Sequence, residues 1–493
     1  MKIISIASMR ALEARAVASG TPEYRLMRRA GTRAAAVLEE YAANRFRRVV
    51  FFCGGGNNGG DAIVAAGSLN RLPHVFLPFK DLSQLQGAAR EAFQEFGARL
   101  NIEDPAQFDF VPGDLIVDAL LGIGFTGDTL REPAASALTM IRNSRCPVVA
   151  FDLPSGMNGD TGATAPGTVK ADLTLTFGLP KQGMFTASGK NYCGKISVIP
   201  IGVEKMSITG ERAYEYFTAA EARQLWEAPA LDDHKNSRGR VLLLCGSMQY
   251  PGAACLAAKG ALHFSGLVRL LTVNAPHMPR LPAALISRQI HADVTGALPP
   301  EILDANADFL SASDVLCAGC GWGSSVSPAL LKKVLDFPGP IVLDADGLNV
   351  LSRNRKIWNY RSDAVLTPHP GEAARLAAAF GIAPELEREE LAAELARRLG
   401  ATVVLKGFHT CVATPDGKVT VNCSGGPELA MAGSGDVLAG MTAALIARIK
   451  DIPAAVRLAV YLHGASGDAG CGAVIADSLP RLAAERAASQ IWW

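Results

Sequence analysis

The residues best suited to chemistry stand near the end of the chain, in the series Gly433-Ser434-Gly435-Asp436. The two glycines would let backbone N–H groups approach a phosphate closely, and the apolar residues that follow predict a helix whose N-terminus carries partial positive charge. Asp436 could take a proton from a hydroxyl group that is about to meet that phosphate. The alternative is an ordinary capped helix, because Ser and Asp are common at helix starts. This stretch alone leaves both interpretations open.

A second glycine-rich segment, residues 54–61, directly follows the short apolar run of residues 49–53. Such a run predicts a strand buried on both faces, and the helical pattern after the glycines completes a strand, loop and helix. Gly54, Gly56 and Gly59 satisfy the dinucleotide-binding pattern G-x-G-x-x-G. The asparagine and backbone oxygens of the same loop equally suit a cation. A plain turn of residues that tolerate positive φ is the third interpretation.

Two further predicted strands deliver an aspartate at their ends. Residues 115–117 lead into Asp118, and residues 147–151 lead into Asp152, each followed by a glycine-containing loop. The carboxyl ends of parallel strands line the ligand crevice of an open sheet, so we expect both aspartates to converge with the loop at 54–61. One such aspartate is usually a cap or a turn former, whereas two beside a glycine loop favour a site.

The second half of the chain repeats this alternation of strands and helices. A predicted strand and its glycine loop lie at residues 239–247, and further predicted strands lie at 268–273, 315–318, 341–343, 364–366 and 402–405. The alternation predicts a second α/β sheet, and there is no Walker A loop, which excludes a P-loop enzyme. After the strands, Lys406 could pair with a nucleotide phosphate, and Asp344 or Asp346 could lie near Mg²⁺ through water. By itself, His369 is better explained as a structural histidine between prolines.

Length and composition limit the partners. A chain of 493 residues predicts two to four domains at about 150 residues each, and we expect two, 1–215 and 216–493, divided in a polar segment. The 48 basic and 47 acidic residues give no electrostatic case for nucleic acid or an acidic membrane. No apolar run reaches the roughly 18 residues of a membrane helix. We therefore expect a cytoplasmic protein with small-molecule substrates and reduced, structural cysteines, and we also expect a homo-oligomer.

The ordered series of motifs resembles a known fusion of two enzymes. The first half, through residues 54–61, 118–128 and 152–156, resembles NAD(P)H-hydrate epimerase. The second half resembles the ADP- or ATP-dependent NAD(P)H-hydrate dehydratase, and its likeness is carried by residues 234–239, 344–349, 367–372, 406–407 and 433–436. The resemblance implies an α/β protein of two domains, an N-terminal Rossmann-like three-layer sandwich and a C-terminal ribokinase-like fold.

The resemblance also implies a repair activity. Hydrated NADH and NADPH carry a 6-hydroxyl group as R and S epimers, which the first half would interconvert. The second half would dehydrate the S epimer at the expense of ADP or ATP with Mg²⁺, and the fused bacterial architecture favours ADP. With ADP, the products would be AMP, phosphate and restored NAD(P)H.

Residue roles follow from the resemblance by matching positions. K⁺ would be held by Asn58, Asp118 and Ser155. In the first half the hydrate would contact Asn57, Asn58, Gly59, Gly60, Asp61, Gly122, Ile123, Gly124, Phe125, Thr126, Gly127, Asp128 and Asp152. In the second half the hydrate would contact Ala253, Gly319, His369 and Asp436, and the nucleotide would contact Lys406, Gly407, Phe408, His409, Thr410 and Gly435. Asp118 is the expected acid–base group of the first half, and Asp436 is the expected base of the second.

Three rival functions remain at this stage. A ribokinase-type kinase of a small molecule, with a nucleotide-binding N-terminal module, would share the loop around Asp436. A Rossmann dehydrogenase would use Gly54, Gly56 and Gly59 and would need a second substrate for hydride exchange. Alternatively, the first half could be a non-catalytic binding module. The epimerase-like motifs disfavour the kinase, and the intact Asn58 and Asp118 disfavour the non-catalytic module.

Overall fold

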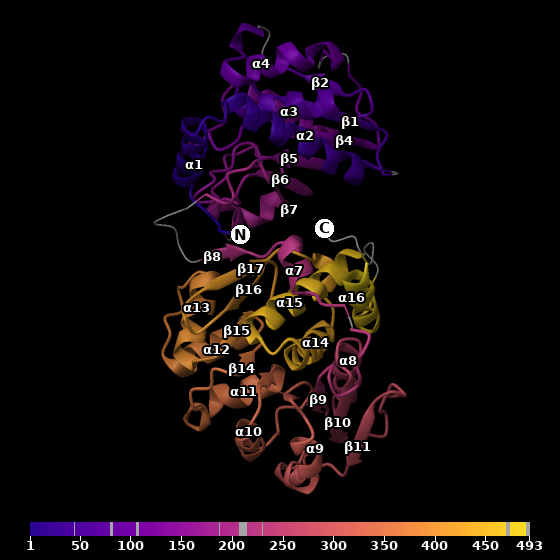
Figure 1. Ribbon diagram of the computed structural model, residues 1–493. Coiled ribbons are helices and arrows are strands. Elements are labelled where there is room, and N and C mark those ends of the chain that lie inside the picture. The colour runs from indigo at the N-terminus through magenta and orange to yellow at the C-terminus, as the bar shows by residue number, and fades with distance from the viewer. Residues whose placement is uncertain are drawn as a thin grey trace. The chain divides into compact units, whose positions relative to one another are not determined.

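The computed structural model describes residues 1–43, 45–78, 82–104, 108–186, 188–206, 214–228, 230–469 and 474–489. The chain divides into two compact units, Met1–Arg212 and Ala213–Trp493, each with its own sheet (Figure 1). The expected boundary at 215/216 falls inside a short strand, β8 (Tyr214–Tyr216), that belongs to the second sheet. Three residues are too short to show alternation, so the sequence carried no strand signal there.

The first unit is built on a seven-stranded sheet in the order β3-β2-β1-β4-β5-β6-β7, and every neighbouring pair is parallel. Its strands are β1 (Arg48–Cys53), β2 (His74–Phe76), β3 (Asn101–Ile102), β4 (Asp114–Ala119), β5 (Val148–Phe151), β6 (Leu173–Phe177) and β7 (Lys195–Ile199). Its helices are α1 (Ile6–Ala18), α2 (Glu23–Ala42), α3 (Asn57–Ser68), α4 (Gly87–Phe96), α5 (Ala134–Ser144) and α6 (Lys190–Cys193).

Strand β1 shows why this sheet is covered on both faces. Val49 and Phe51 join a core with residues of α1, α2, α3 and α4, whereas Val50 and Phe52 join a second core with residues of α5. Successive side chains of a strand point to opposite faces, so both faces of the sheet are apolar and covered. The predicted three-layer sandwich is therefore confirmed.

The strand order creates a crevice beside the end of β1. The chain leaves β1 for β2 on one side and later returns to β4 on the other, which makes the carboxyl ends of β1 and β4 a topological switch point. Helix α3 begins there at Asn57, so residues 57–61 form its first turns, although the sequence suggested a loop. The asparagines and Asp61 thus point from a helix start and not from an open turn.

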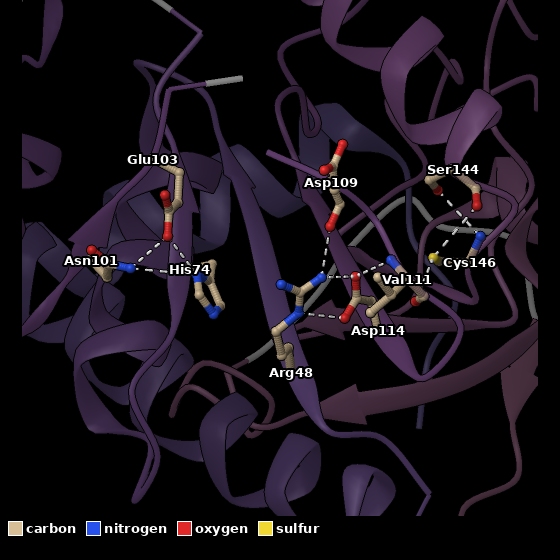
Figure 2. Close-up of polar contacts among 9 residues, drawn as sticks. All are labelled: Arg48, His74, Asn101, Glu103, Asp109, Val111, Asp114, Ser144 and Cys146. Carbon is tan, nitrogen blue, oxygen red and sulfur yellow. Dashed lines mark hydrogen bonds and ion pairs between the residues drawn. The ribbon is translucent and has the colours of Figure 1, made fainter. Parts of the chain in front are cut away.

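The opposite, amino edge of the sheet is held by polar contacts (Figure 2). The Arg48 guanidinium donates two hydrogen bonds of 2.7 Å to the carboxylate of Asp114, the residue paired with it across β1 and β4. Asp114 is fully buried and also accepts a hydrogen bond from the backbone N–H of Val111 at 2.9 Å. A bidentate pair at this position fixes the register of the two central strands.

The second unit contains a ten-stranded sheet in the order β11-β10-β9-β12-β13-β14-β15-β16-β17-β8. Its other strands are β9 (Arg240–Leu244), β10 (Leu267–Val273), β11 (Ile286–Ile290), β12 (Val315–Ala318), β13 (Ile341–Leu343), β14 (Ala364–Leu366), β15 (Thr402–Leu405), β16 (Thr410–Ala413) and β17 (Val419–Asn422). The pairs β15/β16 and β16/β17 are antiparallel, and the other pairs are parallel. Strands β8, β11, β16 and β17 were not predicted from the sequence.

Helices cover this sheet as well. They are α7 (Ala219–Leu225), α8 (Pro251–Leu262), α9 (Ala307–Ser311), α10 (Pro328–Leu335), α11 (Ala345–Arg353), α12 (Pro370–Phe380), α13 (Arg388–Leu399), α14 (Ser434–Ile449), α15 (Ile452–Ala469) and α16 (Leu479–Ala488). Helices α8, α14 and α15 share one core with alternate residues of β9, including Val241 and Leu243. The intervening Leu242 and Leu244 are equally buried, so the other face is covered too. Among the described residues, no helix is both long enough and apolar enough to cross a bilayer.

The switch point in the first unit gives a test of backbone packing. A Cβ atom on Gly54 would lie 2.0 Å from the carbonyl oxygen of Leu120, whereas a Cβ atom on Gly56 would meet nothing within 4 Å. We expect Gly54→Ala to lower the free energy of unfolding of the first unit by about 3 kcal/mol, because two backbones must separate. Gly56→Ala should change it by less than about 0.5 kcal/mol. Urea unfolding followed by circular dichroism compares them, and equal losses would contradict the packing argument.

Candidate active sites

The first site begins with a buried network around Asp118, the last acid of β4. One carboxylate oxygen, Oδ1, accepts hydrogen bonds from Ser155 Oγ at 2.6 Å and the N–H of Leu120 at 3.3 Å, and Oδ2 accepts one from the N–H of Ser155 at 2.9 Å. Burial raises the pKa of Asp118, although these hydrogen bonds act in the opposite direction. Both oxygens are engaged, which suits a fixed ligand better than a group that must move a proton.

Asn58 is linked to this network, because its Nδ2 and the Ser155 hydroxyl both donate to the carbonyl oxygen of Leu121. Its Nδ2 donates to the carbonyl oxygens of Leu121 at 2.9 Å and Phe151 at 3.1 Å, which fixes the orientation of the amide. Its Oδ1 is buried and accepts no hydrogen bond from the described residues. This orphaned buried oxygen and the oxygens of Asp118 and Ser155 are ligands of the kind that a hard cation prefers. The three residues expected to hold K⁺ are therefore brought together.

Asp152 occupies a strained position at the end of β5. Its φ is +62°, in the left-handed region that non-glycine residues rarely adopt. Its Oδ2 accepts the N–H of Ile123 at 3.2 Å, and its Oδ1 lies 2.5 Å from Lys181 Nζ. The Lys181 side chain is only 1% exposed and also donates to Thr176 Oγ1 at 2.9 Å. Sequence reasoning missed Lys181, which stands in no motif.

A cavity of about 430 Å³ opens on this side of the first unit. Its lining is mainly apolar and includes Met27 and Phe177. The polar side chains on its walls are Arg10, Glu13, Glu23, Asn57 and Asp61. Burial and the nearby Asp152 and Glu13 carboxylates raise the pKa of Asp61 well above its ordinary value. Asn57 and Asp61 thus line the cavity, and their contact with a hydrate stays a prediction. Glu13 and Arg10 come from α1, which no motif singled out.

The other predicted hydrate contacts of the first unit divide into two groups. Gly59 and Gly60 serve packing, because Cβ atoms there would lie 1.8 Å from the Gly54 carbonyl oxygen and 2.5 Å from Met27 Cε. Gly122 lies beside Asp152, and Ile123 is tied to α1 through its carbonyl, which accepts a hydrogen bond from Arg10 at 3.1 Å. The rest of this loop does not line the described part of the cavity, and it comprises Gly124, Phe125, Thr126, Gly127 and Asp128.

The second site is built on another lysine–aspartate pair. Lys406 Nζ, just after β15, lies 2.6 Å from Oδ1 of Asp344, which precedes α11 and is 1% exposed. A Cβ atom on Gly435 would lie 3.3 Å from that nitrogen and 3.7 Å from Asp344 Oδ2. The start of α14 therefore faces the ion pair, and the absence of a side chain at Gly435 leaves room beside it. Helix N-terminus and lysine together make a strong anion site.

Asp436 lies in the first turn of α14, within the field of this pair. Burial and the Asp344 carboxylate raise its pKa to about 6, against the opposing influence of a hydrogen bond from the Cys320 thiol and the charge of Lys406. Such a carboxyl is mostly ionised at neutral pH and yet basic enough to accept a proton. The predicted base is thus placed beside a predicted nucleotide-binding lysine.

The turn before Asp436 depends on two further features. Gly433 has φ of +87°, a conformation that favours glycine. The Ser434 hydroxyl and carbonyl both lie near His463 Nε2, at 3.1 and 3.0 Å. Burial lowers the pKa of His463 to about 4, so this histidine of α15 is neutral and holds the turn by hydrogen bonding. His463 could not be singled out from the sequence, because it lies within a long apolar helix.

The remaining predicted residues of the second site surround the same pair. Gly319 has φ of +107°, and a Cβ atom there would lie 2.1 Å from the Asp344 carbonyl oxygen. Ala253 packs against the next turn, since a Cβ atom on Gly321 would lie 2.6 Å from its side chain. Residues 407–410 follow Lys406 into β16, with Phe408 42% exposed. Their contacts with a nucleotide remain predictions.

His369 acts as the N-cap of α12. Its Nδ1 accepts the N–H of Gly371 at 3.0 Å, and its own N–H donates to Glu372 at 2.9 Å. Burial, with the charge of Lys406, lowers its pKa. The structural interpretation of this histidine is therefore correct, and a contact with a hydrate would be an additional role.

Comparison with known proteins supports the two-part reading of the chain. Residues 23–183 match the family model described as YjeF-related protein N-terminus, and residues 241–486 match the model described as NAD(P)H-hydrate dehydratase. A ribokinase-like superfamily protein from Enterococcus faecalis V583 has a solved structure that matches with a TM-score of 0.50 and 23% identity, covering 57% of this chain and 98% of that one. This match confirms the predicted ribokinase-like fold.

Curated relatives match along nearly the whole chain. The bifunctional NAD(P)H-hydrate repair enzyme Nnr of Gloeobacter violaceus is 36% identical over 488 residues, covering 94% of this chain and 93% of that one. The enzyme of the same name from Moorella thermoacetica is 35% identical over 470 residues, covering 91% of this chain and 88% of that one. Both domain matches and both relatives agree, and the chain belongs to the family of bifunctional NAD(P)H-hydrate repair enzymes.

Proposed function

We propose that this chain restores hydrated NADH and NADPH in the cytoplasm, with K⁺ in the first site and Mg²⁺ with ADP or ATP in the second. The first unit interconverts the R and S hydrates, and the second dehydrates the S form. The observation that carries the proposal is the second site, where Asp436 lies one residue from Gly435 beside the Lys406–Asp344 pair. A base next to an anion site is what phosphoryl transfer to a hydroxyl group requires.

The dehydration follows from this arrangement. Hydroxide is a poor leaving group at neutral pH, so the 6-hydroxyl group is first converted into a phosphate ester. Asp436 removes the hydroxyl proton while the oxygen takes the terminal phosphoryl group of the nucleotide. Lys406 and the N–H groups at the start of α14 stabilise the transferring charge. Phosphate then leaves C6, and loss of a proton from C5 restores the ring double bond. With ADP as donor, the other product is AMP.

In the first unit we assign Asn58, Asp118 and Ser155 to a K⁺ ion, which would supply a fixed positive charge for the hydroxyl-bearing part of the substrate. The support is the buried, unpartnered Asn58 Oδ1 beside two other oxygen ligands. The cavity lined by Asn57 and Asp61 is the proposed place for the hydrated ring.

The decisive experiment mixes R and S hydrates of NADH with the full chain, K⁺, Mg²⁺ and either ADP or ATP. Complete recovery of reduced-nicotinamide absorbance would support both activities. Recovery that stops at the S fraction would support the second unit alone. A stable phosphorylated product would instead support a small-molecule kinase, and no reaction with either nucleotide would refute the proposal.

The role of Asp436 predicts both a mutational and a pH effect. Asp436→Asn keeps the side-chain size but removes the base, so kcat for dehydration should fall by about 10²–10⁴-fold. In the unchanged chain, the rate should fall as the pH drops through about 6, because the base works only when ionised and its pKa is raised to that value. Stopped-time assays on the S hydrate measure both. A rate independent of pH between 5 and 8 would contradict the assignment.

Removal of K⁺ gives a separate test of the first site. Replacing K⁺ by a large organic cation should slow epimerisation and leave dehydration of the pure S hydrate unchanged. Asn58→Ala should raise the K⁺ concentration that gives half-maximal epimerisation by at least about tenfold, because it deletes the unpartnered Oδ1. An Asn58→Ala variant with an unaltered K⁺ response would exclude this residue as a ligand.

A further inference from the structure

Helix α1 presents one carboxyl group to the cavity of the first unit. Met9, Leu12 and Ala16 lie on the buried face of this helix, and Glu13 is half-buried and lines the cavity. The helix is anchored near its start, because the N–H of Ile6 donates to Asp160 Oδ1 at 2.7 Å. The position of Glu13 is therefore set by packing and not by a flexible loop.

Asp61 reaches the same cavity from α3. The charged groups that act on these two carboxyls come from every neighbouring element, and they are Arg10 on α1, Glu23 on α2, Asp152 after β5 and Lys181 after β6. Lys181 is already engaged with Asp152 at 2.5 Å, and Glu23 accepts a hydrogen bond from Asn57 at 2.8 Å. The ion pairs among the described residues include neither Glu13 nor Asp61. Two carboxyl groups thus share one cavity without a cation of their own.

The burial and the neighbouring charges shift the pKa values of Glu13 and Asp61. Burial, followed by the Asp152 carboxylate, raises the pKa of Glu13 to about 7. The same causes raise the pKa of Asp61 well above its ordinary value. At neutral pH Glu13 is therefore divided between its acid and its ionised form, and Asp61 holds its proton more tightly than an ordinary aspartate, as suits an acid–base pair.

Epimerisation at C6 needs such a pair and no added reagent. A base takes the 6-hydroxyl proton as the C6–N1 bond breaks, giving an aldehyde at C6, and an acid delivers a proton to N1. The open chain rotates, and N1 then attacks the other face of the aldehyde. The N1 proton returns to the first acid and the new hydroxyl oxygen recovers its proton, so atoms and charges balance.

We propose that Glu13 and Asp61 are the acid–base pair of the first unit, with Glu13 as the base at the 6-hydroxyl group and Asp61 as the acid at N1. The inference rests on the proposed epimerisation and adds to it a residue from outside the motifs. It leaves Asp118 to the cation, in keeping with a carboxylate whose two oxygens already accept hydrogen bonds.

The test uses the full chain and the purified R hydrate of NADH without nucleotide, followed by chromatography of the two epimers. Glu13→Gln should lower kcat for epimerisation by about 10²–10⁴-fold with little change in KM. The matched control is Glu40→Gln on α2, an exposed acid with a raised pKa that does not line the cavity. It should behave like the unchanged chain. Dehydration of the S hydrate should be normal in both variants.

The pH profile separates proton transfer from a structural effect. In the unchanged chain, kcat for epimerisation should fall as the pH drops through about 7, because Glu13 acts in its ionised form. The residual kcat of Glu13→Gln should no longer fall as the pH drops through about 7. In the unchanged chain kcat should also fall at high pH, where Asp61 loses its proton, and Asp61→Asn should remove this fall.

Each other outcome has a defined meaning. If the unchanged chain does not epimerise the hydrate, the proposed function of the first unit fails. If it does, and Glu13→Gln stays within threefold in kcat or changes only KM, the acid–base inference is overturned. If Glu13→Gln no longer binds the hydrate, the pH dependence of kcat in the unchanged chain and in Asp61→Asn gives the answer. A kcat that stays constant between pH 5 and 9 overturns the inference, whereas a kcat that falls as the pH drops through about 7 supports it.

Discussion

Each half of this chain depends on a lysine paired with an aspartate at the carboxyl end of its sheet. Lys181 lies 2.5 Å from Asp152 in the first unit, and Lys406 lies 2.6 Å from Asp344 in the second. A lone buried charge would be costly, so a partner of opposite charge stabilises each buried member of these pairs. Burial raises the pKa of the carboxyl groups that stand beside these pairs, Asp61 and Asp436. The paired aspartate adds to this rise in each unit, whereas the lysine opposes it.

The two sites apply this arrangement to different chemistry because their loops differ. In the second unit, Gly435 has no side chain and leaves room between the first turn of α14 and Lys406, which suits an anion at a helix N-terminus. In the first unit, Asn58 and Ser155 present oxygens and leave one of them without a donor, which suits a cation. Beside both sites, at Gly54 and at Gly319, the backbone lies so close to a neighbouring carbonyl oxygen that neither position has room for a side chain.

Much of this could be predicted from contiguous motifs. Strands β1, β4, β5 and most of the second sheet were located from apolar runs, and the residues at their ends do converge, because parallel strands bring their carboxyl ends to one edge. Lys181, His463 and Glu13 could not be found in this way. Each is a single residue on an element without a motif, and its role comes from three-dimensional packing.

Some helix and strand boundaries could not be predicted from the sequence either, and the reasons are physical. Helix α3 starts at Asn57, although glycine at positions 59 and 60 disfavours a helix. The two glycines stand there because close contacts with Gly54 and Met27 leave no room for side chains. Strands β16 and β17 pair with each other in antiparallel fashion after a series of parallel strands. That change of direction depends on sheet-edge pairing and leaves little trace in hydrophobic periodicity.

Strand β8 determines where the two halves of the chain can be separated. It comes before every other strand of the second sheet in the chain, yet it lies at one edge of that sheet and pairs with β17. A dehydratase half released by a cut after residue 216 would leave the outer edge of β17 bare, and a bare edge is a template for aggregation. Any recombination that exchanges the catalytic halves between relatives must therefore carry Tyr214–Tyr216 along with the second half. The boundary between the two units therefore lies before β8, a strand that the polar connecting segment did not reveal in the sequence.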